Sequence, residues 1–396
     1  MMHAKNSDML TQRVIPATPL AIDWQQLAAD IKTWAIALGF SQCGIADTDL
    51  KVEEPRLQAW LDANFHGEMA YMATHGMMRC RPEALHPGTQ RVISVRLDYL
   101  PKAAGFATNL AAADQAYISR YALGRDYHKL MRNKLQQLAT QIQTHVGAFG
   151  YRPFVDSAPV LERPLAAKAG LGWVGKHSLL LNAEAGSWFF LGELLVDLPL
   201  PVDAPVSEAC GQCVACITMC PTGAIVAPYV VDARKCISYL TIEHPTDIPE
   251  ELRSKIGNRI YGCDDCQLVC PVNRSAPETS QADFQRRPQW QDQSLLALFQ
   301  WDETTFLKNT EGSAIRRIGF QRWQRNLAVA LGNAPYQPEI EQALLAYTQQ
   351  INNVDAMVLR HVQWALTQQQ QKLCAEPSRQ QQRLIRTIQI GLPRDA

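Results

Sequence analysis

Eight of the eleven cysteines in this sequence stand at spacings that suit iron–sulfur chemistry. The first group is the run Cys210-x2-Cys213-x2-Cys216-x3-Cys220, followed directly by a proline. This is the spacing of bacterial ferredoxins, in which three cysteines of one loop hold a [4Fe–4S] cubane and the fourth reaches a second cubane. The proline stops the loop from continuing as a helix.

A second, partial run provides further ligands. It reads Cys263-x2-Cys266-x3-Cys270, again followed by a proline, but Ile260 stands where its first cysteine would be. Cys236 lies between the two runs and can provide the missing thiolate. Because the fourth cysteine of each run crosses over to the other cubane, we predict two ligand sets: Cys210, Cys213, Cys216 and Cys270 for cluster one, and Cys220, Cys236, Cys263 and Cys266 for cluster two.

A pair of zinc sites is the alternative interpretation, because CxxC pairs also bind zinc. The partly repeated x2-x2-x3-Cys-Pro pattern is a poor zinc pattern, so we favour two clusters. Two cubanes in one small module form a short electron path. The long region in front of them favours a catalytic site beside that path over a pure carrier. The remaining thiols, Cys43, Cys80 and Cys374, have no partners at ligand spacing and are interpreted as buried or incidental.

A glycine-rich stretch at residues 170–177 resembles two nucleotide-binding patterns without fulfilling either. For GxGxxG the context is wrong, because a helical segment precedes it and a strand follows it. For a P-loop, His177 replaces the Ser or Thr that would hold magnesium. We expect these glycines to let the backbone pass close to a large, flat or phosphate-bearing group.

Asp156 follows a short predicted strand and has two interpretations. It can cap the next helix, or it can donate the proton that an oxyanion needs after reductive cleavage of a carbon–oxygen bond. The second role requires a carboxyl group whose pKa is raised by burial. His128, at the start of a predicted helix, could be an axial metal ligand, but a structural histidine is the simpler interpretation.

Composition limits the possible functions. The chain has 38 basic and 38 acidic residues, so any contact with nucleic acid must use local patches. The longest apolar stretch, residues 188–202, is interrupted by Glu193 and Asp197, and we predict no membrane span. The N-terminus has no apolar signal region. We therefore expect a cytoplasmic protein, whose reduced cysteines serve metal binding or catalysis.

Alternating helices and strands predict an α/β domain ahead of the cysteines. We expect helices at 24–38 (capped by Asp23), 56–64, 126–146 and 162–169, strands at 91–100 and 154–155, and a hairpin of 179–181 with 188–196 around residues 184–186. The predicted domains are a disordered leader (1–20), an α/β catalytic domain (21–200), a ferredoxin-type double-cluster domain (201–285) and a helical region (286–396).

Several stretches taken together resemble the epoxyqueuosine reductase family, whose members complete queuosine at the wobble position of certain tRNAs. They are RCRP at 79–82 with PGT at 87–89, RYALGRDYH at 120–128, VDSAPVLER at 155–163, GLGWVGKHS at 170–178, and the two cysteine runs. The resemblance covers roughly residues 24–370.

The resemblance implies a nitroreductase-like α/β domain that binds base-off cobalamin, which is reduced through the clusters. It implies a tRNA with a GUN-type anticodon as substrate, a low-potential electron donor such as ferredoxin or flavodoxin, and no membrane partner; we expect a monomer. By motif position, the implied residues are Asp156 as proton donor; Arg79, Ser119, Asp156, Ser238 and Asp264 at cobalamin; and Arg163 and Lys176 on the tRNA side. Ser119 stands where some relatives place a cysteine near cobalt, so a thiol role is not available here.

The C-terminal region predicts paired amphipathic helices at 322–331 and 355–368, which resemble a short HEAT-like unit. A basic patch of Arg316, Arg317, Arg322 and Arg325 could meet tRNA phosphates. A solvated helix face is the alternative interpretation of this patch.

Two other functions stay open on the sequence alone. A corrinoid reductive dehalogenase would use related chemistry, but the twin-arginine leader of that class is missing. A non-enzymatic electron-transfer protein would have the clusters and no tightly bound corrinoid.

Overall fold

A four-stranded antiparallel sheet forms the framework of the N-terminal half, in the order β1-β2-β7-β4. Its strands are β1 (Gln42–Ala46), β2 (Arg91–Asp98), β7 (Phe189–Val196) and β4 (Tyr151–Phe154). The structure, a computed structural model, describes residues 22–102, 104–291, 293–349, 355–372 and 379–391. The expected leader at 1–20 and the thiol of Cys374 lie outside the described residues.

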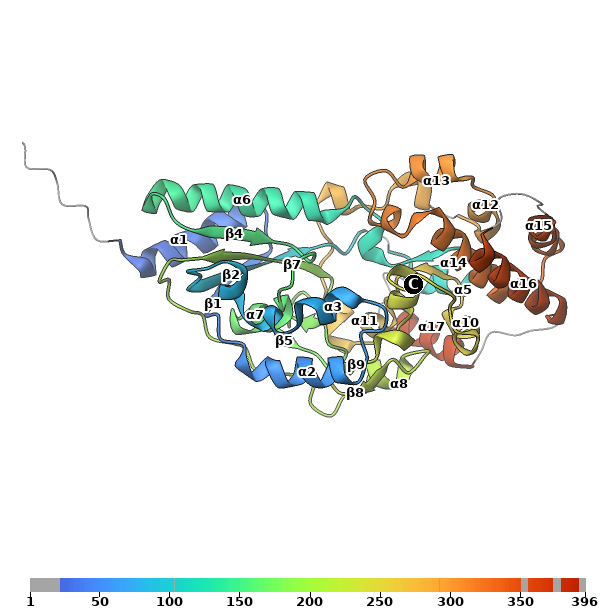
Figure 1. Ribbon diagram of the computed structural model, residues 1–396, viewed down its shortest axis with the longest axis horizontal. Helices are drawn as coiled ribbons and strands as arrows, with labels where there is room; N and C mark the ends of the chain where they lie inside the picture. The colour runs from blue at the N-terminus through green and yellow to red at the C-terminus, as the bar shows by residue number, and fades with distance from the viewer. Residues whose placement is uncertain (1–21, 103, 292, 350–354, 373–378, 392–396) are drawn as a thin grey trace, which may run out of the picture.

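Helices cover both faces of this sheet (Figure 1). On one face lie α1 (Trp24–Ala37) and α6 (Tyr127–Val146), and on the other lie α2 (Glu54–Asp62) and α7 (Glu162–Lys168). The side chains of β7 alternate between the two faces, as a central strand requires. Leu194 packs in the cluster of α1 and α6, whereas Leu195 packs with Leu165 of α7.

Local signals in the sequence predicted several of these elements correctly. The Asp23 side chain caps α1 and the Asp126 side chain caps α6, each by accepting backbone N–H groups. The expected hairpin is wrong. Strand β6 (Leu180–Leu181) pairs with β5 (Trp173–Val174), and β7 instead lies between β2 and β4. Strand β7 is buried along almost its whole length, because helices cover both faces of the sheet and a strand pairs with each of its edges.

The segment that carries the cysteines consists of short elements. They are α8 (Ala215–Met219), β8 (Ile225–Ala227), β9 (Val230–Val231), α9 (Ile237–Ile242), α10 (Glu250–Ile256), β10 (Arg259–Tyr261) and α11 (Asp265–Leu268). Strand β10 pairs in parallel with β3 (Tyr117–Ile118). This pairing joins the cysteine segment to the sheet half and sets Ser119, directly after β3, beside the second cysteine run.

The C-terminal part is helical, as expected. It contains α12 (Leu295–Phe299), α13 (Glu303–Asn309), α14 (Gly319–Asn333), α15 (Pro338–Thr348), α16 (Ala356–Gln371) and α17 (Arg379–Gly391). Helix α16 packs against both α14 and α15. Helix α17 does not extend this stack. It packs on α5 (Phe106–Ala111), and its Leu384 and Ile388 belong to the apolar cluster that also contains Cys216. The remaining short helices are α3 (Ala70–His75) and α4 (Pro82–Leu85).

Candidate functional site

The eight predicted cluster ligands lie in two groups in space. Burial raises the pKa of Cys216 to about 11, and the neighbouring thiols of Cys270, Cys213 and Cys210 contribute to that rise. Cys270 responds in the same way to burial and to Cys210 and Cys213. The fold therefore brings Cys270, from the second run, to the three cysteines of the first loop. We call these four residues the outer cysteine group, because Cys213 is exposed to solvent.

The other four predicted ligands form the inner cysteine group. Burial, followed by the thiols of Cys236 and Cys220, raises the pKa of Cys266 well above its ordinary range. Burial, Asp265 and Cys236 do the same for Cys263. Cys266 also senses Cys216 of the outer group, so the two groups adjoin. Each group thus contributes four thiols, which is the number of protein ligands of one cubane.

A cavity of about 370 Å³ begins at the inner cysteine group and extends to the sheet half. All four inner cysteines line it. Its other lining residues include Ser119, Tyr121, His177, Ser178 and Ser238. The cavity therefore connects the predicted second cluster with two of the residues expected at cobalamin, Ser119 and Ser238.

Asp264 lies behind Ser119 and not in the cavity. Its carboxylate is fully buried and accepts hydrogen bonds from the Ser119 hydroxyl (2.5 Å), the Tyr117 hydroxyl (2.8 Å) and the Arg120 amide (3.0 Å). Gly262, at φ +71°, makes the close approach possible, since a Cβ there would lie 2.6 Å from Cβ of Ser119. Both oxygens of Asp264 are therefore already bonded, and the carboxylate holds Ser119 in place. The contact of Asp264 with the cofactor stays a prediction.

Asp156 lies in the loop between β4 and α7, at φ +56°, a backbone conformation that is rare for a residue with a side chain. Its Oδ2 accepts a hydrogen bond from the Tyr127 hydroxyl (2.6 Å) and lies 3.5 Å from Nε2 of His128. Nδ1 of His128 is 2.7 Å from Oδ1 of Asp126, the residue that caps α6. The two carboxylates thus hold the His128 ring from both sides.

Because of these contacts, the pKa of Asp156 is lowered, whereas the proton-donor role predicted from the sequence required a raised pKa. Burial alone would raise its pKa, but the hydrogen bonds from His128 and Tyr127 outweigh burial and keep the pKa below its ordinary value. Asp126 and then Asp156 raise the pKa of His128 to about 9, against the opposing effect of burial. At neutral pH His128 is therefore protonated, and the Asp156 carboxyl beside it is ionised.

Two buried polar groups near this site have unused hydrogen-bonding capacity within the described part of the chain. Nε of Arg79 and Nε2 of His177 are buried and make no hydrogen bond. Arg79 also donates to the carbonyl of Tyr71, and its own carbonyl accepts from the amide of Leu161, which ties it to the Asp156 loop. His177 lines the cavity, and an unpaired buried group there is expected where a polar ligand completes the site. The residues present therefore fit a large cofactor that carries amide groups, as cobalamin does.

The structure separates the basic residues that the sequence assigned to tRNA. Arg163 is exposed at the edge of the Asp156 loop and donates to the carbonyl of Ser178. The Nζ of Lys176 donates to the carbonyls of Gly211 (2.6 Å) and Cys213 (3.1 Å). These contacts favour a structural role for Lys176 in the loop of the outer cysteine group over the predicted contact with tRNA.

The predicted basic patch at the start of α14 is also only partly a surface feature. Arg316 and Arg317 are exposed, and Arg317 pairs with Glu243 (2.7 Å). Arg325, however, is 0% exposed and donates to the carbonyls of Leu240, His244 and Thr246. Arg322 is half-buried and donates to the backbone carbonyls of Ile318, Ile242 and Arg317. Arg325 is therefore a buried connector between α14 and the cysteine segment.

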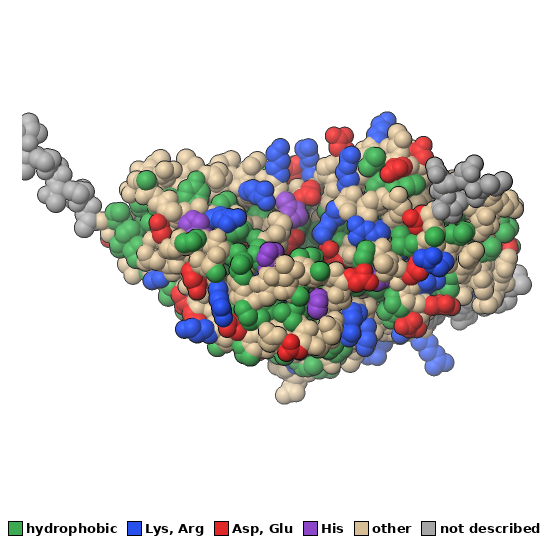
Figure 2. All heavy atoms as spheres, in the orientation of Figure 1, with side chains coloured by type: hydrophobic (Ala, Val, Ile, Leu, Met, Phe, Trp, Pro, Cys, Tyr) green, Lys and Arg blue, Asp and Glu red, His purple; other side chains and the backbone are tan. Residues whose placement is uncertain are grey.

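Figure 2 shows Lys, Arg and His side chains around the middle of one face, where the sheet half meets the C-terminal helices. Arg317 belongs to this side of the site, because its charge lowers the pKa of both Asp156 and Asp126. A positively charged rim beside an acid–base pair suits a substrate that carries phosphates.

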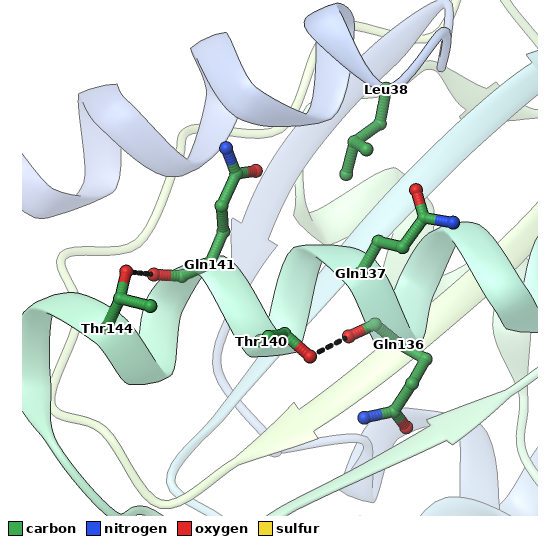
Figure 3. Close-up of a pocket in the computed structure, with 6 residues that line it drawn as sticks. All are labelled: Leu38, Gln136, Gln137, Thr140, Gln141 and Thr144. Atoms are coloured by element: carbon green, nitrogen blue, oxygen red, sulfur yellow. Dashed lines mark hydrogen bonds between the residues drawn. The ribbon is translucent and has the colours of Figure 1, made fainter.

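A separate hollow of about 320 Å³ lies between the end of α1 and the outer side of α6 (Figure 3). The hydroxyls of Thr140 and Thr144 donate to carbonyls of their own helix. The hollow has no ionisable side chain and carries no chemistry. It is lined by Leu38, Gln136, Gln137, Thr140, Gln141 and Thr144.

Three residues at or next to Asp156 were not predicted from the sequence. The Tyr127 hydroxyl donates to the Asp156 carboxylate, the Glu162 carboxyl accepts from the Asp156 amide, and Glu193 is buried beside Glu162. A carboxylate in the middle of an apolar strand, such as Glu193, was the one available signal.

Comparison with protein families matches two parts of the chain. A model described as "Epoxyqueuosine reductase QueG, DUF1730" matches residues 79–157, and one described as "4Fe-4S double cluster binding domain" matches residues 209–273. The first range includes Arg79 and Asp156, and the second includes all eight predicted ligands. None of the helices in the described ranges has the length and apolarity that a bilayer crossing requires.

Several curated proteins are similar over almost their whole length. An epoxyqueuosine reductase of Shewanella oneidensis is 65% identical over 376 residues, 94% of this chain and 95% of that protein. The epoxyqueuosine reductase of Vibrio cholerae is 64% identical over 375 residues, which cover 95% of this chain and 100% of that protein. That of Escherichia coli is 59% identical over 379 residues, which cover 95% of this chain and 99% of that protein.

Solved structures of epoxyqueuosine reductases are also similar to this chain, at 25% sequence identity. A selenomethionine-labelled epoxyqueuosine reductase superposes with a TM-score of 0.77, covering 94% of this chain and 99% of that chain. An epoxyqueuosine reductase with an epoxyqueuosine-modified tRNA-Tyr stem-loop gives 0.75, with 92% and 98% covered. A Bacillus subtilis structure, with an aspartate-bearing catalytic loop swung out of its active site, gives 0.76, with 93% and 99% covered.

Proposed function

The chain belongs to the epoxyqueuosine reductase family, and from this membership we propose that it reduces epoxyqueuosine to queuosine at the wobble position of tRNA, the last step of queuosine biosynthesis. One observation carries the assignment to this site. The cavity extends from the inner cysteine group to Ser119, beside the sheet half that carries the acid–base pair of Asp156 and His128. Tyr121, which lines the cavity, packs edge-on against Tyr127, whose hydroxyl donates to Asp156, so electrons and protons would meet beside one cavity.

The cofactors are two [4Fe–4S] clusters, in keeping with the matched double-cluster domain, and base-off cobalamin. The outer group (Cys210, Cys213, Cys216 and Cys270) would hold one cluster, and the inner group (Cys220, Cys236, Cys263 and Cys266) the other. Arg79, Ser119, His177 and Ser238 would hold cobalamin, with Asp264 fixing Ser119. When bound, cobalamin supplies a strongly reducing metal centre for the cleavage of the carbon–oxygen bonds.

The protein's own residues manage the protons. His128 carries a proton at neutral pH, and its ring nitrogen is 3.5 Å from the Asp156 carboxylate. Asp156 is 52% exposed at its side chain and is the member of the pair that can reach substrate. We therefore assign Asp156 as the group that delivers the proton to the departing oxygen and His128 as the group that recharges it.

A tRNA with a GUN-type anticodon is the proposed substrate, because a relative's structure contains an epoxyqueuosine-modified stem-loop. Arg163, Arg316 and Arg317 are exposed and would contact its phosphates.

Electrons would enter at the outer cysteine group. Cys213 is exposed there, and the neighbouring Val214 is 46% exposed, whereas the inner cysteines surround the cavity. A low-potential one-electron carrier of the ferredoxin or flavodoxin kind fits this arrangement. We further propose a monomer that works in the cytoplasm.

The finer fold description rests on the packing seen here. A sheet with helices on both faces supports a nitroreductase-like domain at residues 21–200. The pairing of α16 with α14 and α15 supports a short HEAT-like unit within residues 286–396, following a double-cluster domain at 201–285.

The test is a reaction of the anaerobically reconstituted protein with cobalamin, dithionite and tRNA that carries epoxyqueuosine. Nucleosides released from the tRNA are then analysed for queuosine. Formation of queuosine that depends on cobalamin supports the proposal. Reduction of cobalamin without conversion of the tRNA would indicate another corrinoid enzyme, such as a dehalogenase, and absence of cobalamin binding would indicate an electron carrier.

A further inference from the structure

Glu193 is a carboxyl group at a position where the fold needs none. It lies in the middle of β7, in the otherwise apolar sequence FFLGELLV, and is 0% exposed. Its cross-strand neighbours are Ser94 of β2 and Phe154 of β4. A buried carboxylate without a partner is strongly unfavourable, whereas leucine would fit this strand. A function other than packing therefore has to account for Glu193.

The group within hydrogen-bonding reach of Glu193 is the carboxyl of Glu162, at the start of α7. Within the described part of the chain, neither oxygen of Glu193 receives a hydrogen bond from an N–H or O–H group. Two carboxyl groups can bond to each other only if a proton lies between them. Buried carboxyl pairs elsewhere share one proton for this reason.

Among the described residues, no cation forms an ion pair with either carboxyl group. Arg163 is adjacent in sequence, but its guanidinium donates to the carbonyl of Ser178. The hydroxyl of Ser94 is buried and makes no hydrogen bond in the described residues. The charges that act on the pair are Asp156, which disfavours ionisation, and Arg163, which favours it on Glu162. Burial and Asp156 raise the pKa of Glu162 to about 7, and burial and Glu162 raise the pKa of Glu193 well above its ordinary value.

The pair is joined to the acid–base site through Asp156. Oε1 of Glu162 accepts a hydrogen bond from the backbone amide of Asp156 (2.6 Å). Glu162 is half-buried and Glu193 is fully buried, so Glu162 is the member that faces the loop. Asp156 therefore meets His128 through its carboxylate and Glu162 through its backbone amide.

We propose that Glu162 and Glu193 share a proton and that this pair is a second proton reservoir for Asp156. The inference rests on the proposed function, whose chemistry needs two protons. An epoxide, two electrons and two protons give an alkene and one water: both carbon–oxygen bonds break, a carbon–carbon π bond forms, and the oxygen leaves as water. The electrons arrive through the clusters. One proton comes from His128 through Asp156, the second from the carboxyl pair, and solvent restores both afterwards.

Two isosteric variants, Glu193→Gln and Glu162→Gln, test the proposal. Both keep the size of the side chain, and in Glu162→Gln the side-chain amide oxygen can still accept the hydrogen bond from the Asp156 backbone amide. Neither variant can share the proton. We expect the single-turnover rate at neutral pH to fall about tenfold in both, one proton-transfer step being worth at least that much. The KM for tRNA should not change.

The pH profile separates a proton role from a structural role. In the wild-type protein the single-turnover rate should fall as the pH rises through about 7, where Glu162 loses its proton. It should fall again near pH 9, where His128 does. Glu162→Gln should lose the first inflection and keep the second, and Glu193→Gln should move the first inflection to higher pH, because Glu162 keeps its burial and the charge of Asp156 but loses the hydrogen bond with Glu193. A wild-type profile in either variant, with full iron and cobalamin content, would overturn the proposal.

A measurement without turnover makes the two proposals distinguishable. Infrared spectra of the full chain should contain a protonated-carboxyl band at neutral pH that disappears in both glutamine variants. Persistence of that band in both variants would overturn the shared proton. An inactive wild-type protein that shows the band would count against the proposed function and leave the carboxyl pair in place.

Discussion

Replacing Asp156 by asparagine separates the two halves of the acid–base pair. The amide oxygen of asparagine can still accept the hydrogen bond from the Tyr127 hydroxyl, which spans 2.6 Å in the wild-type protein. The variant loses the negative charge near His128 and the ability to carry a proton. We therefore expect both clusters and cobalamin to be retained, while turnover falls by about 10²–10⁴-fold, the range typical of a lost acid–base group.

The effect on His128 can be estimated from its two partners. Asp126 is the closer one (Nδ1 to Oδ1 2.7 Å), and Asp156 is more distant (Nε2 to Oδ2 3.5 Å) and 52% exposed. Together they raise the pKa of His128 to about 9. One pKa unit corresponds to about 1.4 kcal/mol, and solvent screening limits an exposed pair to about 1 kcal/mol. The Asp156→Asn variant should thus lower the pKa of His128 to about 8.

Asp126→Asn is the matched control. It removes the stronger partner of His128, so it should lower the pKa of His128 by more than Asp156→Asn does. It leaves Asp156 able to deliver a proton, so it should reduce turnover by less. NMR titration of the imidazole reports the pKa values, and anaerobic single-turnover formation of queuosine reports the rates.

The two measurements should rank the variants differently: Asp126→Asn should have the lower pKa of His128, and Asp156→Asn should have the lower turnover. If turnover follows the pKa of His128 and Asp126→Asn is the slower enzyme, His128 alone determines the rate and Asp156 is not the delivering group. Turnover within about threefold of the wild-type rate in Asp156→Asn would remove Asp156 from the mechanism altogether, because a lost acid–base group costs far more.

Three further predictions concern the clusters, the RNA contact and the fold. Cys236→Ala should lower bound iron from about eight to about four atoms per chain; full iron content would show that another residue is the ligand. Arg316 and Arg317 changed together to alanine should weaken tRNA binding and reduce the salt slope by about 1.4, whereas Lys176→Ala should leave the slope unchanged, and equal slopes in both variants would place the RNA elsewhere. Arg325→Met should destabilise the fold by about 3 kcal/mol or more, because it leaves several buried carbonyls unpaired; an unchanged melting temperature would contradict this.

The features that the sequence predicts well are local ones. Asp23 precedes an apolar periodic segment and caps a helix as expected. The helix predicted at 126–146 is also present, with Asp126 as its cap rather than its first residue. The cysteine runs predict which thiols belong together, because cubane geometry fixes the spacing, and the structure groups the same residues. The family resemblance, drawn from several short motifs, is confirmed by the comparisons.

The features that the sequence does not predict depend on distant contacts. The pKa of Asp156 is lowered rather than raised because Tyr127 and His128, separated from it along the chain by the rest of α6 and by β4, fold against it. Lys176 and Arg325 carry charge like any surface residue, and only the fold shows that backbone carbonyls occupy them. The hairpin prediction failed because a continuous apolar run such as β7 does not show which strand it pairs with.

The position of α17 has a consequence for how the cysteine groups depend on the rest of the chain. This helix is far along the chain from the outer cysteine group, yet its Leu384 and Ile388 pack in the apolar cluster that contains Cys216. Its Gln380 also donates to the carbonyl of Cys220, 160 positions earlier. The surroundings of the cysteines are thus completed by a distant helix that contains no cysteine, so substitutions in α17 can change how well the protein retains iron.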